Sequence, residues 1–232
     1  MASSFFPNAA IIPEICHMEK PKKIPTSLYA EMTPNPSAMK FVADRALITG
    51  GLQVEYRSKS EAKGSSALAE ELFNFPFVTS VFISSNYVTV LKDESLGWEM
   101  IVQQLREYIR EWLMENEVAV SAVSADLVSR TRETASGNEK ETKTTSTDYS
   151  SFEPTEYDEE IRFLLYEYVR PAVESDGGAI DFMAYRDKKV YVQLKGSCSG
   201  CPSSTATLKG GIENLLKAKM PDIVEEVVAE AV

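Results

Sequence analysis

The stretch that decides the C-terminal architecture is Lys195-Gly196-Ser197-Cys198-Ser199-Gly200-Cys201-Pro202. It holds two of the three cysteines in a chain of 232 residues. An apolar, β-branched run over 190–194 precedes it and predicts a strand. The proline opens a helical pattern that runs to about 219, because proline is tolerated in the first turn of a helix. The two thiols are therefore expected at a strand-to-helix turn.

Two thiols in this position can form either a metal site or a redox pair. The N-terminus of a helix lowers thiol pKa values, and the thiolate both binds soft metals and attacks disulfides. Thioredoxin-type sites also place CxxC at a helix start, but there the preceding strand belongs to a βαβ unit. Here a predicted hairpin precedes the motif, and the cysteines enclose Ser199-Gly200 rather than Gly-Pro. These differences favour a metal site.

Cys198 and Cys201 supply only half of the four ligands that zinc or an iron–sulfur cluster usually takes. The other candidates, Cys16 and His17, are adjacent in the N-terminal lead-in, where we predict a free thiol with no functional role. The simplest completion of the site is a second copy of the same chain. The ligand count thus predicts a metal-dependent homodimer, whose exposed site suits handing a cluster on.

Composition restricts the partners and the compartment. The formal net charge of −11 argues against nucleic acid and anionic membranes as partners. No apolar run reaches the roughly 18 residues that cross a bilayer. The acidic residues Glu14 and Glu19, with no arginine before Arg45, argue against a transit peptide. Because CxxC with one further cysteine is no disulfide framework, the sequence predicts a reducing, cytoplasmic location.

The chain is predicted to be α+β, with two small domains joined by a flexible linker. Residues 117–153 contain a long polar run that cannot bury enough apolar surface to order itself, so we expect the domains to reorient freely. An irregular lead-in covers 1–23. The two domains are expected at 24–116 and 154–232.

The predicted elements of the first domain follow apolar periodicity. No cluster of residues there suggests chemistry. We expect strands at 26–32, 39–48, 53–57, 78–83 and 87–92, and helices at 67–73, capped by Ser65 or Ser66, and at 97–115.

The second domain is predicted to begin with a helix over 156–169 that ends at Pro171. Its inward stripe should include Tyr168, Val169 and Ala172. Further elements are strands over 179–185 and 190–194, the helix over 202–219 and, from an ambiguous pattern, a strand over 223–229.

An extended pattern now identifies a family. The pattern Gly196-x-Cys198-x-x-Cys201-Pro202-x-Ser204-x-x-Thr207-Leu208-Lys209-x-Gly211-Ile212-Glu213, preceded by Val173-x-x-Asp176-Gly177-Gly178, resembles the C-terminal domain of NifU in the Nfu iron–sulfur carriers. Thr33-Pro34-Asn35-Pro36-Ser37-Ala38-Met39-Lys40-Phe41 resembles the signature of the Nfu N-terminal domain. One departure is Ala179, where the family often has an acidic residue.

The resemblance implies a non-enzymatic scaffold or carrier. A [4Fe-4S] cluster would be bound by Cys198 and Cys201 between two subunits, received from the upstream assembly machinery and delivered to apo iron–sulfur acceptor proteins. The N-terminal domain would help to engage partners. The alternatives are a dithiol-disulfide oxidoreductase and a structural zinc dimerisation module.

Overall fold

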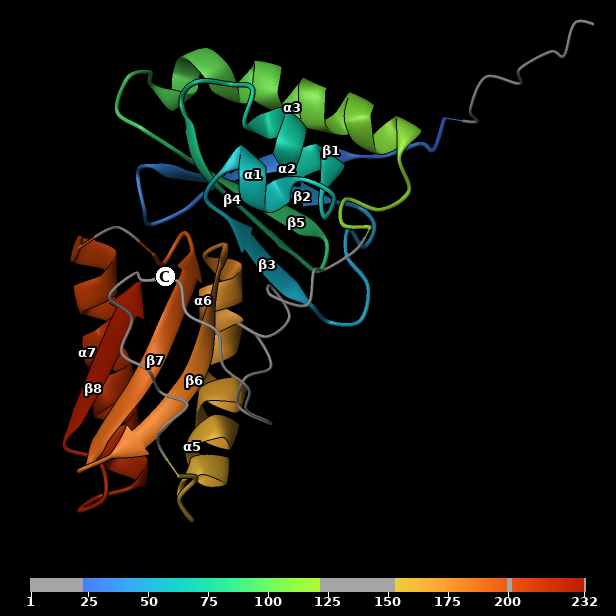
Figure 1. Ribbon diagram of the computed structural model, residues 1–232. Helices are drawn as coiled ribbons and strands as arrows, with labels where there is room; N and C mark the ends of the chain where they lie inside the picture. Colours follow the sequence, from blue (N-terminus) through green and yellow to red (C-terminus); the bar gives the residue numbers. More distant parts are fainter. Residues whose placement is uncertain (1–22, 122–152, 200–201, 232) are drawn as a thin grey trace, which may run out of the picture.

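The computed structural model describes residues 23–121, 153–199 and 202–231. They form two α+β domains, which confirms the predicted class (Figure 1). All but the last residue of the predicted lead-in and most of the predicted linker, together with Cys16, His17 and Cys201, lie outside the described residues. Within the described part of the chain, no helix is long and apolar enough to cross a membrane.

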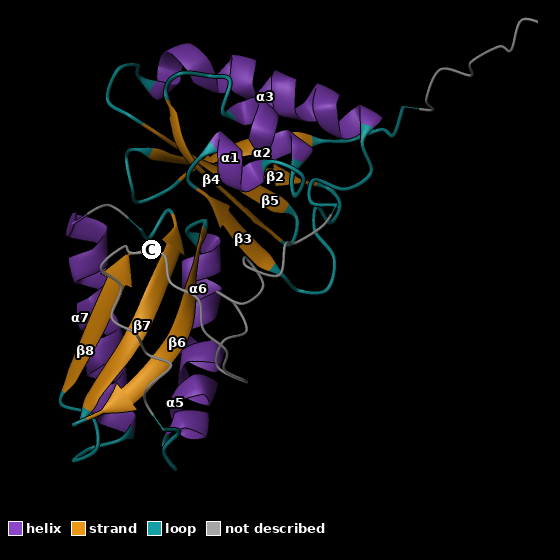
Figure 2. Cartoon of the chain, in the orientation of Figure 1, coloured by secondary structure: helices purple, strands orange, loops and turns teal. Residues whose placement is uncertain are grey.

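The N-terminal domain is an antiparallel sheet covered on one face by helices (Figure 2). The strand order is β1-β2-β5-β4-β3. Buried side chains of the helices and of the sheet face beneath them form its core. The elements are β1 Leu28–Met32, β2 Ala38–Ala43, β3 Gln53–Tyr56, α1 Lys59–Ala62, α2 Ala67–Leu72, β4 Val78–Ser84, β5 Tyr87–Lys92 and α3 Trp98–Glu115.

Most predicted elements of this domain are present, and the differences have local causes. Ser66 caps α2 by accepting the Ala69 N–H. Strand β2 ends at Ala43 rather than at 48, because the N–H groups of Leu47 and Ile48 bond to a hairpin carbonyl instead of a neighbouring strand. The short helix α1 was not predicted.

The C-terminal domain packs helices against a three-stranded sheet of order β6-β7-β8. Strands β6 and β7 form the predicted hairpin, and α7 is the crossover to β8, which lies parallel to β7. The ambiguous last segment is therefore a strand, as predicted. The elements are α5 Asp158–Leu164, a π-helical turn η2 Leu165–Val169, α6 Arg170–Ser175, β6 Gly178–Arg186, β7 Lys189–Gly196, α7 Pro202–Lys219 and β8 Glu226–Ala231.

The predicted helix end at Pro171 is wrong, since helix continues to Ser175. The π-helical turn ends at Val169, two residues before this proline, and covers the turn in which a regular α-helix would bond the N–H that proline lacks. This turn also shifts the inward stripe by one residue. Tyr168 and Ala172, predicted to face inward, are exposed, whereas Val169 is buried as predicted and Val173 is buried in place of Ala172.

The uncovered face of the N-terminal sheet packs against the C-terminal domain (Figure 1). The interface has a small apolar cluster of Val42, Phe82, Tyr87 and Ala179. Hydrogen bonds surround this cluster, as described below. The structure thus describes the two domains in one docked arrangement. That they also reorient stays a prediction.

Candidate metal centre

Cys198 lies between the end of β7 at Gly196 and the start of α7 at Pro202, as the strand-to-helix pattern predicts. Its side chain is buried, with 6% exposed. The sulfur packs against Gly178, where an added Cβ would lie 2.7 Å from Sγ. Only glycine therefore fits beside this thiol.

The turn Asp176-Gly177-Gly178 supports the loop from within the same domain. The Ser197 N–H donates to the Gly177 carbonyl at 3.3 Å, and the Ser197 hydroxyl donates to the Asp176 carbonyl. Gly177 has φ +80°, a left-handed conformation that favours glycine. The paired glycines of the sequence pattern thus form the platform beneath the cysteine loop.

Bonds within the loop and from α7 complete its shape. The Ser199 N–H and hydroxyl both donate to the Gly196 carbonyl, at 3.0 and 2.8 Å. Thr205, in the first turns of α7, donates its hydroxyl to the Cys198 carbonyl at 3.2 Å. These protein hydrogen bonds shape the described part of the loop, residues 196–199.

The N-terminal domain contributes a side chain to the same loop. The Asn35 amide donates to the Ser197 carbonyl at 2.9 Å and to the Ser199 carbonyl at 3.4 Å. Its own carbonyl oxygen accepts the Ser37 N–H, which fixes the orientation of the amide. The sequence predicted no role for Asn35 at the cysteine loop. The available signal was the Thr33–Phe41 pattern, which contains Asn35.

Glu55 is a second contribution from the N-terminal domain that sequence reasoning missed. Its carboxylate faces the Gly196 N–H at 3.5 Å and the Ser199 hydroxyl at 3.4 Å, and it accepts the Ser80 hydroxyl at 3.0 Å. Burial raises the pKa of Glu55, while Arg57 works in the opposite direction. No local pattern marks this residue, because its partners come from elsewhere in the chain.

The environment of the described thiol favours the protonated form. Burial raises the pKa of Cys198 to about 11, against a smaller lowering by the Ser197 hydroxyl. This differs from the predicted lowering by the helix start. The thiol lies ahead of Pro202, and the helix dipole acts mainly within the terminal turn, so desolvation prevails. In this arrangement Cys198 is a protonated, covered thiol rather than a ready ligand.

The described residues do not contain a complete metal site. Among residues 23–121, 153–199 and 202–231, no group of three or more His, Cys, Asp or Glu side chains could hold a metal ion. Of the two predicted ligands, the structure places Cys198, and Cys201 lies outside the described residues.

Two family models match the chain. Residues 28–116 match the model described as "Scaffold protein Nfu/NifU N terminal", and residues 161–228 match the "NifU-like domain". A solution structure of a NifU-like protein from Saccharomyces cerevisiae is 21% identical, with a TM-score of 0.38, and covers 53% of this chain and 100% of that one. A likeness at this level says nothing about function.

Curated relatives carry the description "NFU1 iron-sulfur cluster scaffold homolog, mitochondrial". The protein from Drosophila willistoni is 32% identical over 205 residues, which is 86% of this chain and 63% of the relative. The one from Drosophila ananassae is 32% identical over 201 residues, covering 84% and 62%. The chain thus spans less than two thirds of the length of these relatives.

The predicted cytoplasmic location is wrong, since these relatives are named as mitochondrial proteins. Cysteine usage separates oxidising from reducing compartments, and it does not separate one reducing compartment from another. With an Nfu/NifU N-terminal domain followed by a NifU-like domain, the chain belongs to the Nfu family of iron–sulfur cluster scaffold proteins.

Proposed function

We propose that this protein carries a [4Fe-4S] cluster between two copies of the chain, with Cys198 and Cys201 of each copy as ligands, and passes it to apo iron–sulfur proteins. The observation that carries the proposal is the position of Cys198, in a shaped loop between β7 and α7 of a NifU-like domain. Two thiolates from each chain would complete the four that a cubic cluster takes.

A site of this kind suits a carrier rather than a catalyst. Transfer proceeds by ligand exchange: each iron–sulfur bond to Cys198 or Cys201 breaks as a bond to an acceptor thiolate forms. The acceptor thiol gives up its proton and the released cysteine takes one up, so the cluster keeps its electrons.

The relatives also suggest the setting. Since they are named as mitochondrial, we place this carrier in the mitochondrion, where it would receive its cluster from the assembly machinery and serve apo-proteins of that compartment.

Anaerobic reconstitution with iron and sulfide tests the proposal. We expect a brown dimer with about four irons per two chains. Cys198→Ser and Cys201→Ser should each abolish cluster binding while the fold is kept, and Cys16→Ser is the matched control that should load normally. A full cluster in either ligand variant would contradict the assignment. A metal-free monomer with disulfide reductase activity would support the oxidoreductase instead, and a stable zinc dimer would support the dimerisation module.

A further inference from the structure

Polar side chains on the uncovered face of the N-terminal sheet and its Asn35 turn are matched to main-chain carbonyls of the C-terminal domain. Each donor is buried, and each acceptor lies at the end of α6, at the Asp176–Gly178 turn or in the cysteine loop. The pairs are Asn35 with Ser197 and Ser199, Lys40 with Glu174 and Ser175, Tyr87 with Gly178, and Thr89 with Gly177.

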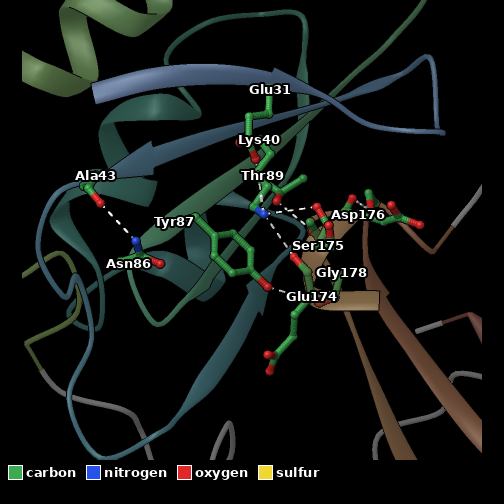
Figure 3. Close-up of polar contacts among 12 residues, drawn as sticks. Glu31, Lys40, Ala43, Asn86, Tyr87, Thr89, Glu174, Ser175, Asp176 and Gly178 are labelled. Carbon is green, nitrogen blue, oxygen red and sulfur yellow. Dashed lines mark hydrogen bonds and ion pairs between the residues drawn. The ribbon is translucent and has the colours of Figure 1, made fainter. Parts of the chain in front are cut away.

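Lys40 makes a charged contact at this interface (Figure 3). Its Nζ donates to the carbonyls of Glu174 and Ser175, both at 3.1 Å, where α6 ends. A cation is favourable at the C-terminal end of a helix, whose last carbonyls lack partners within the helix. Only 8% of Lys40 is exposed, so its charge is stabilised by the other domain and by Glu31 at 3.4 Å.

The surfaces of the two domains also fit together closely at this interface. A Cβ added at Gly177 would lie 2.9 Å from Thr89 Oγ1, and one added at Gly196 would lie 2.8 Å from the Phe82 ring. Thr89 donates to the Gly177 carbonyl at 2.7 Å, and Tyr87 donates to the Gly178 carbonyl at 3.1 Å (Figure 3). The N-terminal sheet thus approaches the glycines that shape the cysteine loop as closely as backbone allows.

We propose that this clamp face, defined by Asn35, Lys40, Glu55, Tyr87 and Thr89, is the binding surface for the cysteine loop of its own chain, and that docking and cluster sharing exclude one another. The second half of the proposal rests on the proposed function. The clamp face is occupied in the cluster-free protein and is vacated when two loops meet around a cluster.

The exclusion follows from where the clamp face touches the loop. Asn35 bonds to the residues on both sides of Cys198, and Glu55 faces Gly196 and Ser199. Cys198 is 6% exposed in this arrangement. Cys198 itself packs in the core of its own domain, and Asn35 and Glu55 hold the chain on both sides of it. A cluster held between two chains needs the sulfur to reach beyond its own chain, so the loop must first leave these contacts, which separates the domains.

The docking equilibrium can be measured on the metal-free full-length chain. In a Cys201→Ser, Cys16→Ser background, the rate of alkylation by iodoacetamide reports how often the Cys198 thiol is uncovered. Asn35→Asp removes the amide donor yet keeps the oxygen that accepts the Ser37 N–H. Losing a buried hydrogen bond and placing a carboxylate against two carbonyls should raise the alkylation rate by roughly tenfold or more.

Asn86→Asp is the matched control. The Asn86 amide donates to the Ala43 carbonyl within the N-terminal domain, away from the cysteine loop (Figure 3). This variant should alkylate at the rate of its parent. Equal rates in the two aspartate variants, whether both fast or both slow, would overturn the docking surface.

Thr89→Val provides a second variant without a new charge, since it replaces a hydroxyl by a methyl of similar size. It should also speed alkylation. In the parent chain with all cysteines intact, it should speed cluster loading, because docking competes with sharing. Slower loading in Thr89→Val would show that the clamp assists the cluster and would overturn the exclusion. Alkylation as expected without any cluster would leave the clamp standing and refute the proposed function alone.

Discussion

The two faces of the N-terminal sheet are both buried, yet they differ in chemistry. Along β2, Met39 and Phe41 face the helices, and Lys40 between them faces the C-terminal domain. Along β5, Val88 and Val90 face the helices, while Thr89 bonds to the other domain. One face is covered by apolar side chains of its own domain, and the other by carbonyls of a second domain.

The two faces contribute to different free energies: one face to the free energy of unfolding the N-terminal domain, the other to the free energy of separating the two domains. Apolar burial against α3 contributes to folding of the N-terminal domain itself. The polar residues of the clamp face gain little from burial as such, because their hydrogen bonds to water are exchanged for bonds to the other domain. Changes on the helix face, which is the face of the N-terminal sheet covered by the helices, should therefore unfold the domain. Changes on the clamp face should instead separate two folded domains.

The largest effect is expected on the helix face. Leu105→Ala, at a position 1% exposed on α3, should lower the free energy of unfolding by about 2–5 kcal/mol through lost burial and a cavity. Denaturant unfolding followed by tryptophan fluorescence measures it, since Trp98 and Trp112 both lie on this helix. Met100→Ala, 70% exposed on the same helix, is the control and should cost about 0.5 kcal/mol or less. Similar losses in the two variants would contradict the comparison.

A smaller and different effect is expected on the clamp face. Lys40→Met keeps an apolar stem but removes the ammonium from two carbonyls at the end of α6. Hydrogen bonds of a charged group contribute about 1.5–3 kcal/mol, so docking should weaken while tryptophan-monitored unfolding changes little. Amide hydrogen exchange of a peptide covering 174–178 should become faster.

The control for this second prediction is Lys92→Met. Lys92 lies over the Trp98 ring within the N-terminal domain, so its loss should leave exchange over 174–178 unchanged. If Lys40→Met instead unfolded the N-terminal domain, the separation of the two faces would be wrong.

Local pattern predicted the helix face and missed the clamp face for a physical reason. Periodicity identifies Leu105 and Ile109 because their burial depends on neighbours a few residues away. Thr89 and Lys40 occupy the alternating positions that usually face solvent. Their burial depends on a domain more than 80 residues further along the chain, which no local window contains.

The cysteine site likewise has features that local sequence predicts and features that it does not. Its position between a strand and Pro202 followed from sequence, because turn and helix-start preferences are local. The raised pKa of Cys198 did not follow, since it arises from burial in the folded arrangement. The exposure of Tyr168 and the burial of Val173 were likewise not predicted, because a π-helical turn changes the period on which the prediction relied.

The smallest predicted effect is a pH-dependent change in domain docking, and it involves Glu55, the acidic residue of the clamp face. Burial raises its pKa, and Arg57 and Lys195 oppose the rise. A carboxyl whose pKa is raised in the docked state favours docking most below its ordinary pKa of about 4.3, and that contribution is lost as pH rises through the raised value. Glu55→Gln, neutral at every pH, should therefore favour docking at pH 7 and make little difference at pH 4.

Small-angle scattering of the metal-free chain at the two pH values tests this through the radius of gyration, which falls when the domains dock. Glu61→Gln is the control, because the Glu61 carboxylate accepts the Arg57 N–H within the N-terminal domain. It should leave the radius unchanged at both values. A Glu55→Gln chain more expanded than its parent at pH 7 would show that the ionised carboxylate holds the loop by its hydrogen bonds. The ionised form of Glu55, rather than the neutral form, would then stabilise docking of the two domains.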